Sequence, residues 1–315
     1  MPATYTRGGD CAVNFETPIE LKGPLRAPRQ MLDSQIVRGD KSLHDSSVAS
    51  SLGLNGAPIE APTHFSQFDP LAVRLWGDAW FERGCISSHF RSMVVEGEFV
   101  QAFMTTTGPT AATIQMLKTD GTVVLDGTAS IGPDHPPTEL DRRRASSRRP
   151  ENLFIVDQME IGTTIHLSDG SSITIDDPNG PLYPFSLSEK IEKITEPHPW
   201  YTPDGAATSP WQRPIVPMEM LSVLANKVEP PWPVRGPSIG LFLDLEIRIL
   251  NGPIFVGEEY GVDAEIVGLS ESKRTESYWT LTTLRGRDKD VKAQVLLHSG
   301  VFKESYAEYP RDRLL

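Results

Sequence analysis

Apolar and polar positions follow two different periods along the chain, and the same order of periods occurs twice. Between Asp69 and Glu82 the apolar residues recur at helical spacing, and from about Ser87 onward they alternate with polar residues. A second helical stretch begins at Pro217 and is again followed by alternating segments. The pattern therefore predicts two similar units in one chain, each a helix followed by β-strands.

The alternating segments predict mainly antiparallel strands. In the first half they cover residues 87–96, 98–105, 111–118 and 122–131, and we expect the first two to pair. In the second half they cover residues 241–250, 258–269, 275–284 and 291–302, preceded by a hairpin of 163–167 with 172–175. Strands that follow one helix without further helices between them indicate an α+β fold, not an alternating β/α one.

Composition changes mark the boundaries between the units. We expect a first domain over residues 1–132 with an N-terminal extension, a Pro/Arg-rich linker at 133–150, and a second domain at 151–315. The second domain contains a Pro- and aromatic-rich segment at 176–214, which is long enough to be a loop that covers a site. In a duplicated chain the chemistry is expected where the two halves meet.

Charge and cysteine content narrow the classes of function. The net charge of −12 argues against binding to nucleic acid, and two cysteines, Cys11 and Cys85, form no disulfide framework. The first seven residues lack the apolar core of a signal peptide, and no stretch is long enough to cross a membrane. We therefore expect a cytoplasmic protein without membrane partners, and a homodimer stays open.

Five arginines lie within the linker, at 142–144 and 148–149. They either bind the phosphates of a pantetheine nucleotide or form a solvated charged loop, which is the commoner role of a charge run. The sequence contains no glycine-rich phosphate loop and no metal-ligand spacing, so no bound cofactor or metal is expected.

Two short motifs resemble those of a known family. Gly252-Pro253-Ile254-Phe255-Val256-Gly257-Glu258 is similar to the strand turn of the MaoC-like acyl dehydratases and hydratases, and Phe68-Asp69-Pro70-Leu71 resembles the start of their central helix. The resemblance covers roughly residues 60–132 and 150–306. It implies a double hotdog, in which two curved antiparallel sheets each wrap a central helix. It also implies a hydro-lyase that acts on an α,β-unsaturated or β-hydroxy carbonyl substrate, for which an acyl thioester of coenzyme A or of a carrier protein is one form.

The catalytic motif of that family departs from its usual form here. Hydratases of the group carry D-x-N-P-[hydrophobic]-H at the helix start, whereas this chain has Gln67 at the first position, Asp69 at the third and Ala72 at the last. The family's Asp–His pair therefore cannot be transferred onto this sequence.

Other acidic and basic groups near the helix start are candidates for the same chemistry. Asp69 and a histidine, His64 or His89, would form the pair that moves one proton at Cα and one at Cβ. We also expect Gln67, Gly84 and Trp76 to contact the substrate, although Trp76 belongs to the apolar stripe as well. Three functions stay open: a hydratase or dehydratase, an acyl thioesterase, and a non-catalytic acyl-binding protein.

Overall fold

A single ten-stranded antiparallel sheet forms the body of the protein. The computed structural model describes residues 18–147, 150 and 152–314. The strands lie in the order β1-β5-β6-β7-β4-β9-β12-β11-β10-β8. Their bounds are β1 Glu20–Lys22, β4 Gly84–Phe90, β5 Val100–Gly108, β6 Ala111–Lys118, β7 Val123–Ile131, β8 Thr164–Ser171, β9 Gly240–Ile249, β10 Tyr260–Glu271, β11 Thr275–Arg285 and β12 Val291–Phe302. A small hairpin, β2 Ile36–Val37 with β3 Asp40–Lys41, lies apart from this sheet.

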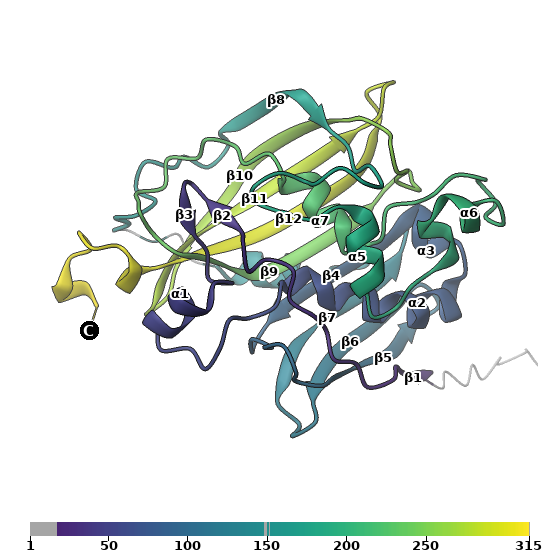
Figure 1. The fold of residues 1–315 in the computed structure, drawn as a ribbon, viewed down its shortest axis with the longest axis horizontal. Helices are drawn as coiled ribbons and strands as arrows, with labels where there is room; N and C mark the ends of the chain where they lie inside the picture. The colour runs from purple at the N-terminus through teal and green to yellow at the C-terminus, as the bar shows by residue number, and fades with distance from the viewer. Residues whose placement is uncertain (1–17, 148–149, 151, 315) are drawn as a thin grey trace, which may run out of the picture.

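The strand order shows the duplication directly. The first half contributes β5-β6-β7-β4 and the second half the mirrored order β9-β12-β11-β10. The halves join where β4 pairs with β9, with Cys85 opposite Arg248 and His89 opposite Asp244. Figure 1 shows the blue strands of the first half meeting the green and yellow strands of the second at this seam. The predicted α+β class and the two-unit arrangement are confirmed.

The central helix of the first half begins earlier than predicted and is interrupted. Its parts are η1 Ala61–Phe68, α2 Asp69–Trp76 and α3 Ala79–Arg83. The break after α2 occurs at Gly77, whose φ of 59° lies in the left-handed region that favours glycine. The second central helix, α7 Met220–Asn226, is buried along most of its length. Both helices pack against one face of the sheet, the inner face, and share one apolar core there.

Two of the predicted strand pairings are wrong. β4 pairs with β7 and β9 instead of with β5, because the connection from residue 91 to 99 carries the chain across the sheet to the other side of β6. The expected hairpin at 163–175 is one continuous strand, β8, whose partner is β10. Both errors concern partners distant in sequence, which local periodicity does not determine.

The connecting segments contain regular structure of their own. The predicted linker holds α4 Glu139–Ser146, which packs on the outer face of the sheet through Leu140. The 176–214 segment holds α5 Leu187–Lys193, η2 Pro199–Tyr201 and α6 Pro203–Ala206. The remaining helices are α1 Ser46–Ser51, η3 Lys303–Ser305 and η4 Arg311–Arg313. Within the described residues, no helix has the length and apolarity needed to cross a membrane.

Candidate active site

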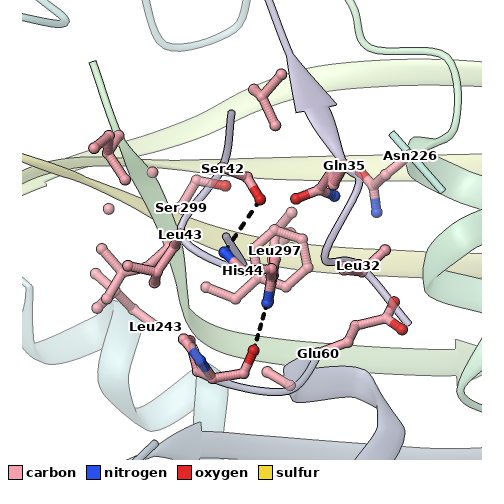
Figure 2. A pocket seen from close by; sticks show the side chains of 18 of the residues that line it. Leu32, Gln35, Ser42, Leu43, His44, Glu60, Asn226, Leu243, Leu297 and Ser299 are labelled. Atoms are coloured by element: carbon pink, nitrogen blue, oxygen red, sulfur yellow. Dashed lines mark hydrogen bonds between the residues drawn. The ribbon is translucent and has the colours of Figure 1, made fainter. Parts of the chain in front are cut away.

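A cavity of about 390 Å³ opens where the two halves and the N-terminal extension meet. The extension supplies residues from 32–44 and 58–64, and the first half supplies 90–94. The second half supplies Asn226 at the end of α7 and residues of β9, β11 and β12. Most of its wall is apolar, with Leu32, Leu43, Leu243 and Leu297 among the lining residues (Figure 2). The position agrees with the expectation that a site forms between the halves.

His44 is a half-buried imidazole on this wall, just before α1. Its Nδ1 lies 2.7 Å from the carbonyl oxygen of Pro58, and a carbonyl can only accept a hydrogen bond. Nδ1 therefore carries the proton, and Nε2 keeps a free lone pair with no partner among the described residues. Burial lowers the pKa of His44, although the Pro58 contact and the charge of Glu60 act in the opposite direction. The imidazole is therefore a neutral base near pH 7.

Glu60 places a carboxylate in the same cavity at the start of η1. It lies next to Lys190 of α5, whose Nζ is 3.3 Å from Glu60 Oε2 and 2.9 Å from Thr63 Oγ1. Lys190 Nζ is also 2.7 Å from Glu219 Oε1, at the start of α7. One buried ammonium thus joins the starts of both central helices. Glu60 Oε1 is buried and has no hydrogen-bond partner within the described residues.

His64, one of the predicted catalytic residues, also lines the cavity. It is only 3% exposed, and its Nδ1 has no hydrogen-bond partner among the described residues. Burial, together with the positive charges of Lys190 and Lys118, lowers the pKa of His64 to about 3. His64 is therefore neutral over the physiological range and can polarise a ligand group without carrying a charge.

Asp69, the second predicted catalytic residue, lies in the core beside the cavity and not on its wall. Trp80 Nε1 donates to Asp69 Oδ1 at 2.8 Å, and the Tyr201 hydroxyl donates to Oδ2 at 3.0 Å. Burial raises the pKa of Asp69 to about 7, against the opposing effect of these two hydrogen bonds. The carboxyl group links α2, α3 and the 176–214 segment, and its part in catalysis stays a prediction.

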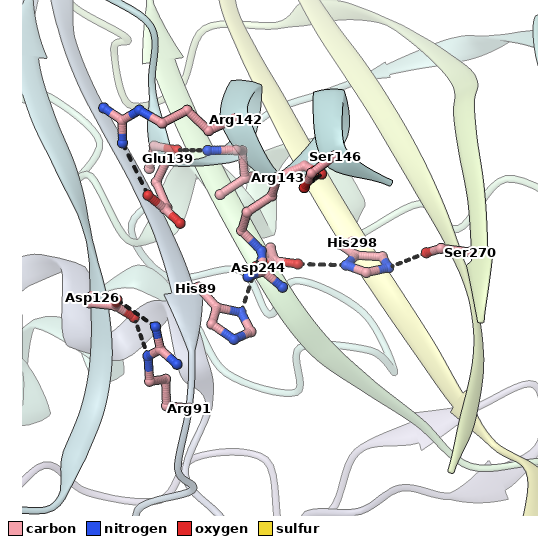
Figure 3. Close-up of polar contacts among 12 residues, drawn as sticks. His89, Arg91, Asp126, Glu139, Arg142, Arg143, Ser146, Asp244, Ser270 and His298 are labelled. Carbon is pink, nitrogen blue, oxygen red and sulfur yellow. Dashed lines mark hydrogen bonds and ion pairs between the residues drawn. The ribbon is translucent and has the colours of Figure 1, made fainter. Parts of the chain in front are cut away.

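His89, the third predicted catalytic residue, lies on the outer face of the sheet. Its Nδ1 is 2.7 Å from Asp244 Oδ1, and His298 Nδ1 is 2.5 Å from Asp244 Oδ2 (Figure 3). Arg143 of α4 approaches the same carboxylate, with its Nε 2.8 Å from Oδ1. Burial raises the pKa of Asp244, but these partners outweigh it and hold the pKa at about 2. The cluster therefore connects α4 to β4 and β9, the strands at which the halves join.

The predicted substrate contacts also fall outside the cavity wall. Both amide atoms of Gln67 are buried without a partner among the described residues. Gly84 lies against the Trp80 backbone so closely that a Cβ would overlap the Trp80 carbonyl oxygen. Trp76 donates from Nε1 to the Pro109 carbonyl oxygen at 3.0 Å and stacks on Trp80. These three residues therefore pack the helix region, and their part in substrate binding stays a prediction.

The arginine run is largely engaged with the protein itself. Arg142 pairs with Glu139 at 3.1 Å, Arg143 with Asp244, and Arg144 donates to the Val267 carbonyl oxygen at 3.3 Å. Arg148 and Arg149 lie outside the described residues. The described arginines thus hold α4 in place.

Sequence reasoning missed His44 and Glu60. Both belong to the polar, turn-rich extension, where no periodic pattern drew attention to them. One local signal was present: Glu60 precedes Ala61-Pro62, and proline near the first helical position marks a helix start. His44 reaches the site only through tertiary packing, for which no sequence signal exists.

Comparison with known proteins places the fold. No family model and no curated protein sequence matches the chain. Among solved structures, a MaoC domain protein from Chloroflexus aurantiacus J-10-fl, described as a dehydratase, is similar with a TM-score of 0.57 and 14% identity. The match covers 95% of this chain and 99% of that one. A conserved Mycobacterium tuberculosis protein with a double hotdog fold matches with a TM-score of 0.50 and 13% identity, covering 90% and 97%. The chain therefore has the double-hotdog fold that its resemblance to the MaoC-like group predicted.

Proposed function

We propose that this protein is a hydro-lyase that adds water to, or removes it from, an acyl substrate within the cavity at the junction of the halves. The observation that carries the proposal is that His44, His64 and Glu60 line the same cavity. The wall of this cavity is more apolar than polar, although it also includes Arg38, Lys41, Arg91 and Glu229. Acid–base groups held in an apolar pocket are the usual mark of such a site. The shared fold with a protein described as a dehydratase supports the same class.

His44 is the proposed base. In dehydration, its free Nε2 takes the proton from Cα of a β-hydroxyacyl substrate, and the electron pair of the broken C–H bond passes to the carbonyl oxygen as an enolate. That pair then returns to form the Cα–Cβ double bond as the bond from Cβ to the hydroxyl oxygen breaks, and the imidazolium gives the same proton to that oxygen, which leaves as water. Hydration is the reverse. The Pro58 carbonyl keeps Nδ1 protonated throughout, so that Nε2 is the only nitrogen available for this transfer.

Glu60 and His64 support this proton transfer. The carboxylate of Glu60 raises the pKa of His44, so it stabilises the imidazolium that forms during the reaction. Lys190 holds Glu60 through Oε2 and leaves Oε1 free. His64 stays neutral, and its proposed role is to donate a hydrogen bond to the carbonyl oxygen of the substrate, where negative charge develops.

Glu60 also favours a second candidate, an acyl thioesterase. A carboxylate with one free oxygen in an apolar cavity can activate a water molecule for attack on a thioester carbonyl. The two reactions differ in their products, because hydrolysis releases a free thiol whereas hydration removes only the enoyl double bond. A non-catalytic acyl-binding protein would bind such ligands without either change.

The test compares variants of the cavity with a matched histidine on the outer face. Purified protein is assayed with a panel of enoyl and β-hydroxyacyl thioesters, following enoyl absorbance and thiol release separately. His44→Gln and Glu60→Gln are expected to lower kcat/KM by about 10²–10⁴. His89→Gln, which changes the Asp244 cluster, and the exposed His166→Gln should leave it within about twofold. Turnover that survives both cavity substitutions would contradict the proposal.

A further inference from the structure

Two amide side chains on the cavity wall have a fixed orientation. Gln35 Nε2 donates to the carbonyl oxygen of Leu182 at 2.6 Å, and Asn226 Nδ2 donates to the carbonyl oxygen of Ser222 at 2.8 Å. Rotating either amide by 180° would set a carbonyl oxygen against a carbonyl oxygen, so each amide has one stable orientation. Both residues line the cavity and are drawn there in Figure 2.

The orientation of the two amides determines which of their hydrogen-bonding atoms remain available to a ligand. With the two NH₂ groups bonded to the backbone, Gln35 Oε1 and Asn226 Oδ1 have no donor among the described residues. Glu60, which also lines the cavity, has a further acceptor without a partner among the described residues, but this oxygen, Oε1, is already buried, which leaves the two amides as the acceptors in question. An acceptor that is desolvated by a ligand without a matching donor loses its hydrogen bond to water and gains nothing in return.

We propose that Gln35 and Asn226 are specificity-determining residues that select a ligand with O–H or N–H donors and disfavour a plain hydrocarbon chain. The proposal deepens the hydro-lyase assignment and rests on the same cavity. The donor has two chemically equivalent sources: a hydroxyl group on the acyl chain, or the amide N–H groups of a pantetheine-like arm. A site that hydrogen-bonds a ligand group rejects an analogue lacking it far more strongly than an apolar pocket rejects an extra methylene.

Binding of saturated ligands, which a hydro-lyase cannot turn over, tests this, and absence of thiol release shows that they stay intact during the measurement. The first ligand series is hexanoyl, 6-hydroxyhexanoyl and 6-methoxyhexanoyl thioesters of one short thiol, which differ only at the end of the chain. The methoxy compound has an oxygen but no donor. The second series compares a hexanoyl thioester of pantetheine with one of an alkyl thiol of equal length, which lacks the amides. Dissociation constants are measured by calorimetry for the unaltered protein, Gln35→Leu and Asn226→Leu.

In at least one series the donor-bearing ligand is expected to bind at least about tenfold more tightly than its donor-free partners. The series that shows the preference identifies the source of the donor. In Gln35→Leu and Asn226→Leu that ratio should fall towards one, with the donor-free ligands bound as before. Equal binding across both series, or a preference that persists in both variants, would overturn the proposal. A protein that shows the preference but no turnover would instead contradict the hydro-lyase assignment alone.

Discussion

Replacing Asp69 by asparagine separates a structural carboxyl group from a catalytic one. Asparagine fits the site, because its Oδ1 can accept from Trp80 Nε1 while its Nδ2 donates to the Tyr201 hydroxyl oxygen. The substitution removes only the ionisation. Because the pKa of Asp69 is raised from 3.8 to about 7 in the folded protein, folding opposes its ionisation. The free energy of unfolding is therefore unaffected by this group below about pH 4 and is reduced as the pH rises towards 7.

The size of this change in the free energy of unfolding follows from the shift in the pKa of Asp69. A change of about three pKa units corresponds to about 4 kcal/mol of the free energy of unfolding. The protein loses this stability between about pH 4 and pH 7, and above pH 7 the loss stays constant. The difference in free energy of unfolding between Asp69→Asn and the unaltered protein should grow by about this amount from pH 4 to pH 8. Urea denaturation at each pH measures it, and all other groups cancel in the difference. A difference that does not change with pH would show that folding does not raise the pKa of the Asp69 carboxyl group.

Turnover should persist in Asp69→Asn, because Asp69 lies outside the cavity wall. A loss of about 10²–10⁴ in rate would instead show that Asp69 is catalytic.

Three further predictions concern the cavity and the groups behind it. The pKa of His64 is lowered from 6.5 to about 3, so the unaltered protein should lose about 2 kcal/mol of stability between pH 7 and pH 5. The His64→Gln variant should not show this loss, and parallel pH–stability curves of the two proteins would contradict the prediction. Lys190→Met leaves two buried carboxylates without their cation and should lower the free energy of unfolding by about 3–5 kcal/mol, with partial recovery on adding Glu219→Gln. Because burial lowers the pKa of His44 from its ordinary value of 6.5, the midpoint of the fall in kcat/KM at low pH should lie below pH 6.5, whereas a midpoint above pH 6.5 would exclude His44 as the base.

The fold was largely accessible from local sequence patterns. Helical spacing after Asp69 and two-residue alternation in both halves identified the helices and most strands, because each element buries one face against the same core. The pairing of β4 with β9 was not accessible in this way. It joins residues more than 150 positions apart, and periodicity carries no information on such partners.

The site was accessible only in part. His64 lies on the cavity wall because it belongs to the helix start that the motif marked. His89 follows the same helix in sequence, yet strand alternation directs it to the outer face, while its neighbour Phe90 faces the cavity. A shift of one residue in a strand reverses the face, so proximity in sequence was not enough to place this histidine.

A structure of the protein with a bound, unreactive β-hydroxyacyl analogue tests the central claim most directly. The claim is that the acyl group occupies the cavity at the junction of the halves and that His44 Nε2 removes the Cα proton. We expect the ligand Cα within about 3–3.5 Å of His44 Nε2, with the carbonyl oxygen towards His64. A ligand bound on the outer face beside His89, or one in the cavity with its Cα out of reach of His44 Nε2, would contradict this claim.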